Sequence, residues 1–289
     1  MSIGVVAMAY GTPASPDDVE AYYTHIRRGR PPTPELLDDL RRRYDAIGGV
    51  SPLRAHTERQ LARLRDGLGD GYLVELGQKH APPFIEDAVA TLASAGVERI
   101  VGVVLAPHYS RGSVGEYLER LRGAAAEAGL AATGVESWWD LDAWLDFQAA
   151  AVREALQPMP EDTTVLFTAH SLPERVLEGD VYPDQLHDSA KAIAERAGIA
   201  AWDIAWQSAG RTADPWRGPD IREVIASATS AGLLVCAQGF TADHLEVLYD
   251  LDIEAAGDAD RRGIAFARTR MLNDDPAVFA ALAERVRAT

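Results

Sequence analysis

The sequence predicts a doubly wound α/β protein, in which a parallel sheet is covered by helices on both faces. Short apolar runs alternate along the chain with amphipathic stretches that have helical spacing. Strands that are apolar on both faces suit a parallel sheet buried between helices, and alternating strands and helices build such a sheet. The apolar runs span residues 3–10, 72–77, 99–108, 163–170, 201–208, 232–240 and 263–269.

Helix boundary signals lie between these runs. Ser15-Pro16, Thr33-Pro34 and Ser51-Pro52 each offer an N-cap residue followed by a proline suited to the first helical turn. Gly29 and the pair Gly48-Gly49 follow helical stretches and predict their ends.

The chain also contains signs of two similar halves. Residues 105–108 (LAPH) and 167–170 (FTAH) end two predicted strands in a similar way, which indicates equivalent strands in the two halves. We place one domain at residues 1–143 and the other at 144–289. The last helical stretch, 277–287, is expected to pack back on the first half.

Composition excludes several classes of protein. The formal net charge of −16 repels nucleic acid and an anionic membrane. The longest apolar stretches, such as 100–106, are far shorter than a membrane span, and residues 1–4 carry no basic secretion signal. Cys236 is the single cysteine, so an internal disulfide and an all-cysteine metal site are excluded. These features favour a cytoplasmic protein.

Polar side chains gather where the predicted strands end. Ligands of open α/β sheets bind beyond the carboxyl ends of the strands, and Tyr10, His80, His108, His170 and the turn 238–240 lie at or just past such ends. His170 is either a hydrogen-bonded structural residue or a proton acceptor and Fe²⁺ ligand. Tyr10 is either a rim aromatic or a hydrogen-bonding lid, since its phenol ligates a metal only with strong help.

Three carboxylates are spaced four residues apart. On a helix, Glu246, Asp250 and Glu254 form a column along one face. The column drifts by about 40° per step in a regular α-helix, and a local π-turn would change that drift. Their mutual repulsion requires compensation, which a divalent cation would provide. The alternative is a solvated acidic face.

An aromatic and basic cluster stands out in this acidic chain. Guanidinium groups pair well with carboxylates, so the cluster is either a site for an acidic ligand or a helix end that uses arginine to offset its dipole. It comprises Tyr22, Tyr23, Arg27, Arg28 and Arg30.

Six motifs together resemble the ferrochelatases, and most closely the soluble coproporphyrin enzymes of Gram-positive bacteria. The resemblance runs in order from about residue 3 to residue 255. The motifs are 10–13 (YGTP), 22–30 (YYTHIRRGR), 43–49 (RYDAIGG), 168–173 (TAHSLP), 206–210 (WQSAG) and 243–250 (DHLEVLYD).

The resemblance implies two similar Rossmann-like, chelatase-like domains with a porphyrin between them. It implies that His170 and Glu246 face the porphyrin centre and handle metal and protons, and we expect the two side chains to confront each other across a tetrapyrrole-sized gap. Asp250 and Glu254 resemble the outer carboxylates of a metal relay or regulatory metal site. Tyr10 resembles the iron ligand on the opposite porphyrin face.

The resemblance also assigns porphyrin contacts and a reaction. Arg27, Arg43, Tyr44, Ser51 and Tyr117 occupy positions that resemble porphyrin contacts. The implied reaction inserts Fe²⁺ into coproporphyrin III to give coproheme, with release of two protons, as a late step of haem biosynthesis. No tightly bound cofactor is expected; Fe²⁺ is a substrate, and a regulatory divalent metal is an open alternative. The expected protein is a monomer whose partners include neighbouring haem-pathway enzymes.

Two departures from the family pattern refine these expectations. The four cysteines that hold an iron–sulfur cluster in some members are absent, because this chain has only Cys236. The segment 14–32, which is a hydrophobic membrane lip in animal members, is polar and basic here. This favours a substrate with four propionates over protoporphyrin.

Two other functions stay open on the residues alone. A cobalt chelatase of the sirohydrochlorin type shares the expected fold and differs in metal and tetrapyrrole. A tetrapyrrole or metal carrier would use the same cleft without turnover, but would not need a proton acceptor beside a carboxylate column.

Overall fold

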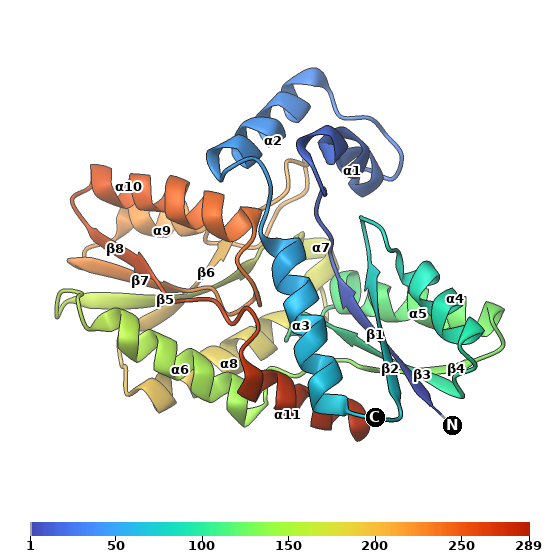
Figure 1. Ribbon diagram of the computed structural model, residues 1–289. Coiled ribbons are helices and arrows are strands. Elements are labelled where there is room, and N and C mark those ends of the chain that lie inside the picture. The colour runs from blue at the N-terminus through green and yellow to red at the C-terminus, as the bar shows by residue number, and fades with distance from the viewer. Residues whose placement is uncertain (1) are drawn as a thin grey trace.

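A computed structural model describes residues 2–289 and contains two four-stranded parallel sheets, each flanked by helices (Figure 1). The strand orders are β2-β1-β3-β4 and β6-β5-β7-β8, so both sheets have the same topology. The strands are β1 (Ile3–Ala9), β2 (Tyr72–Gln78), β3 (Arg99–Val104), β4 (Ala131–Val135), β5 (Thr163–His170), β6 (Trp202–Gln207), β7 (Gly232–Cys236) and β8 (Ala265–Arg268).

Helices cover the faces of both sheets. The α-helices are α1 (Val19–Ile26), α2 (Pro34–Ala46), α3 (Leu53–Leu68), α4 (Ile85–Ser94), α5 (Glu116–Glu127), α6 (Asp142–Leu156), α7 (Glu174–Leu177), α8 (Tyr182–Ala197), α9 (Ile221–Ser227), α10 (Ala256–Arg261) and α11 (Pro276–Arg287). A short 3₁₀ segment, η1 (Pro16–Asp18), precedes α1, and two π-helices are present, η2 (Arg111–Gly115) and η3 (Glu246–Ala255).

The predicted α/β class and the seven predicted strands are confirmed, with corrections to an edge strand and to two strand ends. The strand predicted over 232–240 ends at Cys236, and the turn 238–240 lies beyond it. The edge strand β4 was missed because its sequence, AATGV, is short and mostly solvent-accessible and lacks a continuous apolar run. The strand predicted over 99–108 ends at Val104, and the LAPH segment follows it.

The predicted equivalence of the strands ending in LAPH and FTAH is wrong. β1 and β5 occupy equivalent positions in the two sheets. β1 lies between β2 and β3, and β5 lies between β6 and β7. The counterpart of β5 is therefore β1. Tyr10, which follows β1, corresponds in topology to His170 at the end of β5.

The helix boundary signals behave largely as predicted. The Thr33 hydroxyl accepts a hydrogen bond from the Leu36 amide at the start of α2, and the Ser51 hydroxyl accepts one from the Leu53 amide at the start of α3. Ser15 differs, because its hydroxyl donates to the Asp18 carboxylate instead of capping a backbone amide.

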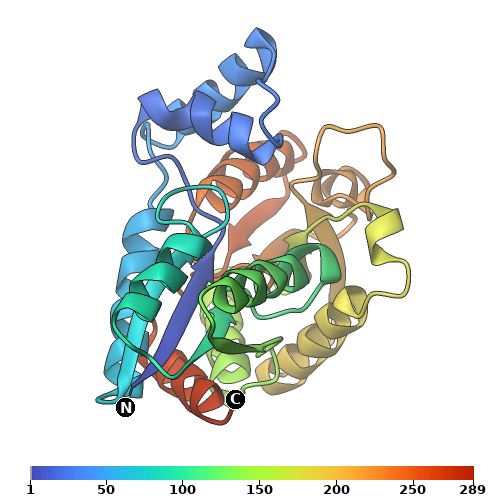
Figure 2. The same ribbon diagram turned by 90° about the vertical axis from the view of Figure 1, so that its right-hand side faces the viewer.

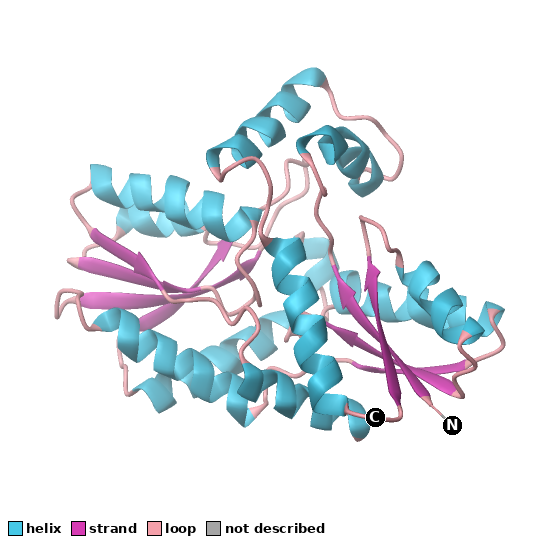
Figure 3. Ribbon diagram, in the orientation of Figure 1, coloured by secondary structure: helices cyan, strands magenta, loops and turns pink. Residues whose placement is uncertain are grey.

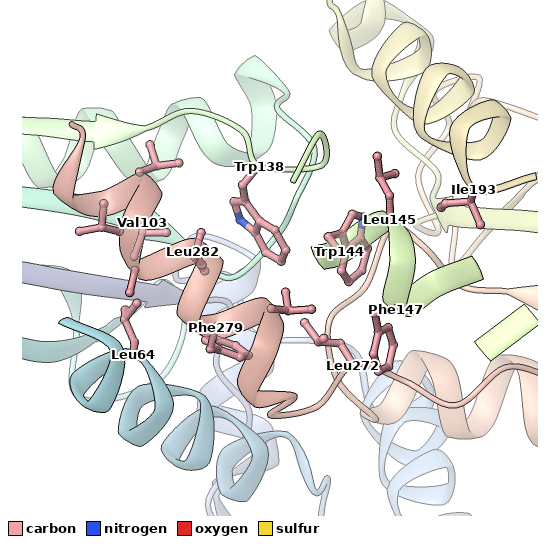
Figure 4. Packing of buried hydrophobic residues seen from close by; sticks show 14 of the residues in the cluster. Leu64, Val103, Trp138, Trp144, Leu145, Phe147, Ile193, Leu272, Phe279 and Leu282 are labelled. Carbon is pink, nitrogen blue, oxygen red and sulfur yellow. The ribbon is translucent and has the colours of Figure 1, made fainter. Parts of the chain in front are cut away.

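One hydrophobic core joins the two halves (Figure 4). Trp138 lies in the connection between β4 and α6, Trp144 lies in α6, and their rings meet edge to face at 5.3 Å between centroids. The helix α6 contacts α8 and β7, and α11 contacts α3, α6 and β4. The division between residues 143 and 144 stays a prediction; it cuts α6, which packs with the second sheet.

The helices α1 and α2 project beyond both sheets (Figures 1 and 2). They are stabilised by a small cluster of their own, in which Val19, Leu37 and Tyr44 are buried and Leu245 of the second half packs against them. In both sheets the strands point toward the middle of the molecule, below α1 and α2 (Figure 3). No helix within residues 2–289 is both long and apolar enough to cross a membrane.

Candidate active site

The first two candidate residues lie at the carboxyl ends of the central strands of the two sheets. His170 is the last residue of β5, and Tyr10 follows the last residue of β1. Gly11 has a left-handed φ of +93°, and a Cβ there would lie 2.9 Å from the Ala81 Cβ. The backbone next to Tyr10 therefore requires glycine for both conformation and space.

The imidazole of His170 contacts the carboxylate of Glu246 directly. Nε2 of His170 lies 3.5 Å from Oε1 of Glu246, and Nδ1 of His170 donates to the Ser171 carbonyl at 2.5 Å. The expectation that these side chains confront each other across a tetrapyrrole-sized gap is wrong. They belong to the same half of the protein and form one pair.

A second histidine completes the surroundings of Glu246. Nε2 of His244 lies 3.5 Å from Oε2 of Glu246, and Nδ1 of His244 is hydrogen-bonded to the Ala242 carbonyl at 2.9 Å. His244 lies within the motif 243–250, but the sequence does not mark its side chain as a site residue. Its spacing of two residues from Glu246 gave no sign that the side chains would meet, because such spacing does not align residues on a regular helix.

The charges of the pair stabilise each other. Burial alone would lower the pKa of His170, but the Glu246 carboxylate and the Ser171 carbonyl outweigh it and raise that pKa to about 9. Burial would raise the pKa of Glu246, whereas His170 and His244 hold it well below its usual range. The electrostatics of the pair therefore favour the protonated form of His170 at pH 7.

The pH dependence of this pair is a testable consequence. We expect the His170 ring resonances to titrate near pH 9 in an NMR experiment. In Glu246→Gln the attraction is lost while burial remains, so the pKa should fall toward or below the ordinary ~6.5. Because the folded-state pKa of His170 lies above the unfolded one, its contribution to stability is complete below pH ~6.5 and is lost as the pH rises through about 9. The lowered pKa of Glu246 has the opposite sign, and its contribution is complete above pH ~4.3 and is lost as the pH falls. A His170 that titrates near pH 6.5 in the wild type would contradict the assignment.

The carboxylate column lies on the π-helix η3, where each member has its own partner. Asp250 accepts from Arg43 at 3.2 Å and from the Ser208 hydroxyl at 2.6 Å, and Glu254 lies 3.8 Å from Arg222. The guanidinium groups of Arg43 and Arg222 therefore compensate part of the charge of the outer carboxylates. Within residues 2–289, no group of three or more His, Cys, Asp or Glu side chains is arranged to hold a metal ion.

Asp250 is distinct from the other two members of the column. Burial and the nearby charge of Glu246 raise its pKa to about 6, against the opposing effects of Ser208 and Arg43. Ser208 adopts a left-handed φ of +60°, uncommon for a residue other than glycine. This backbone strain at a residue that holds Asp250 is typical of functional sites.

Tyrosines of the first half face the Glu246 charge. Burial and then the Glu246 carboxylate raise the pKa of Tyr10. Burial, with Glu246 contributing, raises the pKa of Tyr44 to about 12, and burial followed by the neighbouring tyrosines raises the pKa of Tyr22. Tyr10 is nonetheless 45% exposed, and its ring lies 4.6 Å from that of His80. Leu245, next to Glu246 in the chain, packs against the cluster that contains Tyr44, so the Glu246 carboxylate of the second half lies near phenols of the first half.

The predicted porphyrin contacts divide into accessible and enclosed residues. Arg27 is accessible, with its guanidinium 5.7 Å from the centroid of the Tyr23 ring. Arg43 is bound to Asp39 and Asp250. The other three are buried: Tyr44 hydrogen-bonds Thr12, Ser51 caps α3, and Tyr117 lies beneath Lys79.

Two shallow hollows lie elsewhere on the surface. One, of about 620 Å³, is lined by α1 and its flanks, including Asp17, Thr24 and Gly29. The other, of about 540 Å³, lies beside α7 and includes Glu174 and Arg217. Neither is lined by His170 or Glu246.

Comparison with solved structures defines the class of fold. The chain superposes on a sirohydrochlorin chelatase, SirB, from Bacillus subtilis subspecies spizizenii in complex with cobalt, with a TM-score of 0.56, 11% identity and coverage of 99% of this chain and 94% of that one. It superposes on CbiX, described as the terminal enzyme for siroheme biosynthesis in denitrifying bacteria, with a TM-score of 0.56, 14% identity and coverage of 100% and 99%. The fold is that of the chelatases.

Sequence comparison then defines the family. The sequence model of the Ferrochelatase family matches residues 2–289. The coproporphyrin III ferrochelatase of Bacillus subtilis is 45% identical over 97% of this chain and 96% of its own length. The enzyme of that name from Bacillus pumilus is 46% identical over 97% and 95%. The chain belongs to the ferrochelatase family.

Proposed function

We propose that this protein inserts Fe²⁺ into coproporphyrin III, producing iron coproporphyrin and two protons, in haem biosynthesis. One observation carries the proposal: the ion pair of His170 and Glu246 at the end of β5 shares a space with Tyr10 at the end of β1. A planar macrocycle in that space would have a proton-handling and metal-binding pair on one face and a phenol on the other. The relatives at 45% and 46% identity carry the corresponding enzyme name.

The outer carboxylates supply a path for the metal. Fe²⁺ must lose water before it enters the macrocycle, and carboxylate ligands taken up in sequence reduce that cost. Glu254 and Asp250 precede Glu246 along this path, and the ion pairs with Arg222 and Arg43 hold the two carboxyl groups in place until a dication competes for them. We assign Asp250 and Glu254 to metal relay, with regulatory metal binding as the second candidate role.

The proton balance of the reaction indicates a role for His170 as a proton acceptor. Two pyrrole N–H bonds break, and two protons leave as one Fe²⁺ enters. His170 begins as an imidazolium, so it must release its proton before it can accept another. A dication arriving beside Glu246 weakens the attraction that keeps His170 protonated, and Asp250, with a pKa of about 6, is suited to pass the released proton toward solvent.

The first half supplies the porphyrin contacts. Arg27 and Arg43 bind carboxylates of the macrocycle, while Tyr44, Ser51 and Tyr117 shape its wall, and Tyr10 approaches the metal from the opposite face. We also propose that the protein is a cytoplasmic monomer without a resident cofactor, and that it passes its product to a neighbouring enzyme of the pathway.

The test is anaerobic metal insertion followed by absorption spectroscopy. We expect Fe²⁺ insertion into coproporphyrin III to exceed insertion into protoporphyrin IX, with little Co²⁺ insertion into sirohydrochlorin. Faster cobalt insertion into sirohydrochlorin would support a chelatase of that type. Stoichiometric porphyrin binding without turnover would support a carrier and contradict the proposal.

A further inference from the structure

Three arginines converge on Asp39 of α2. Its carboxylate accepts from Nε of Arg43 at 3.2 Å and lies 2.6 Å from Nη2 of Arg211, and it also pairs with Arg42. The Asp39 side chain is only 16% exposed. Arg211 comes from the segment between β6 and α9 in the second half, so this ion pair joins α2 to the opposite half of the protein.

Arg43 is fixed at two of its three nitrogens. Nε is held by Asp39, Nη1 is held by Asp250 at 3.2 Å, and the guanidinium lies 4.8 Å from the centroid of the Tyr249 ring. A guanidinium carries its five N–H donors in one plane. These contacts therefore fix the plane, and Nη2 of Arg43 has no hydrogen-bond or ion-pair partner among residues 2–289.

We propose that Asp39 is a positioning residue that aims Arg43 at a carboxylate of the porphyrin, and that Arg211 holds Asp39 in place from the opposite half. This inference rests on the proposed function, because it requires a porphyrin carrying carboxylates. An arginine that is already ordered loses less side-chain freedom when it binds a carboxylate, and its fork-shaped donors need the correct orientation.

Two effects of removing the Asp39 charge have opposite signs. Neutralising an acidic residue beside an anionic ligand strengthens binding by simple electrostatics. Releasing Arg43 from its fixed plane weakens binding, because the side chain must then be ordered by the ligand. Weaker binding by Asp39→Asn therefore identifies the positioning role.

The experiment measures coproporphyrin III binding to the full-length chain by fluorescence titration, together with the rate of Fe²⁺ insertion. We expect Asp39→Asn to bind about 3- to 10-fold more weakly, the cost of ordering one flexible side chain, with kcat at saturating porphyrin nearly unchanged. Arg211→Gln, at an exposed position, should weaken binding in the same direction by a smaller factor. It keeps the inference testable if Asp39→Asn does not fold. Asp146→Asn on α6, which pairs with Arg196, is the matched control and should bind like the wild type.

The Arg43→Ala background tests whether Asp39 acts by positioning Arg43 or has a general structural effect. If Asp39 acts through Arg43, then Asp39→Asn added to Arg43→Ala should weaken binding no further. An equal additional loss in that background would overturn the inference, as would unchanged or tighter binding by Asp39→Asn alone. A wild-type chain that neither binds nor metallates coproporphyrin III would overturn the proposed function as well. A wild type that does both, with Asp39→Asn unaltered, would overturn only this inference.

Discussion

His170→Ala should reduce the rate of Fe²⁺ insertion by about 10²- to 10⁴-fold, the range associated with loss of a positioned acid–base group. The substitution also leaves the Glu246 carboxylate with His244 alone, and it removes the partner that lowers the pKa of Glu246 most. Burial then raises the pKa of Glu246, which makes the carboxylate a poorer metal ligand. The measurement is initial-rate spectroscopy of porphyrin metallation under anaerobic conditions.

Porphyrin binding supplies the control for this variant. The predicted carboxylate contacts, Arg27 and Arg43, do not touch His170, so His170→Ala should still quench coproporphyrin III fluorescence with nearly wild-type affinity. His244→Ala should lose less activity, because Glu246 would retain its contact with His170. Metallation by His170→Ala at the wild-type rate would remove His170 from the mechanism.

Trp144→Ala should lower the free energy of unfolding by about 3–5 kcal/mol, the usual cost of truncating a large buried aromatic residue. Trp144 is fully buried in the core shared by the two halves and packs edge to face on Trp138 (Figure 4). A loss of this size is a large part of the 5–15 kcal/mol that stabilises an ordinary domain. Denaturant unfolding followed by tryptophan fluorescence and circular dichroism would measure it.

Two further variants test whether the loss of stability in Trp144→Ala comes from the core shared by the two halves or follows the truncation of any tryptophan. Trp144→Phe keeps most of the packing and removes an indole N–H that has no hydrogen-bond partner in the described part of the chain, so it should cost much less than alanine. Trp139→Ala, at the neighbouring and partly exposed tryptophan, should also cost much less. Equal losses from Trp139→Ala and Trp144→Ala would contradict a special role for the shared core.

The fold was largely predictable because buried parallel strands leave continuous apolar runs. The edge strand β4 lacks such a run, and it was missed for that reason. The prediction that the strands ending in LAPH and FTAH are equivalent is wrong, because similar residues at two strand ends do not show which strands are neighbours. That information lies in backbone pairing, which makes Tyr10 the counterpart of His170.

The composition of the candidate site was more predictable than its geometry. The motifs identified His170, Glu246, Asp250 and Tyr10, but the sequence could not show that His170 and Glu246 touch. Their contact depends on how the segment after β7 folds back, and the π-helix changes which side chains align. The roles of Asp39 and Arg211 were also hidden, because their pairing joins residues 172 positions apart across the two halves.

The position of α11 has a consequence for biosynthesis of the protein. This helix packs against α3 and buries Leu64 of the first half together with Phe279 and Leu282 of its own (Figure 4). During translation, that surface of the first half stays uncovered until the ribosome has made the second sheet and then α11. A nascent chain without α11 should therefore expose a hydrophobic surface that recruits chaperones or promotes aggregation.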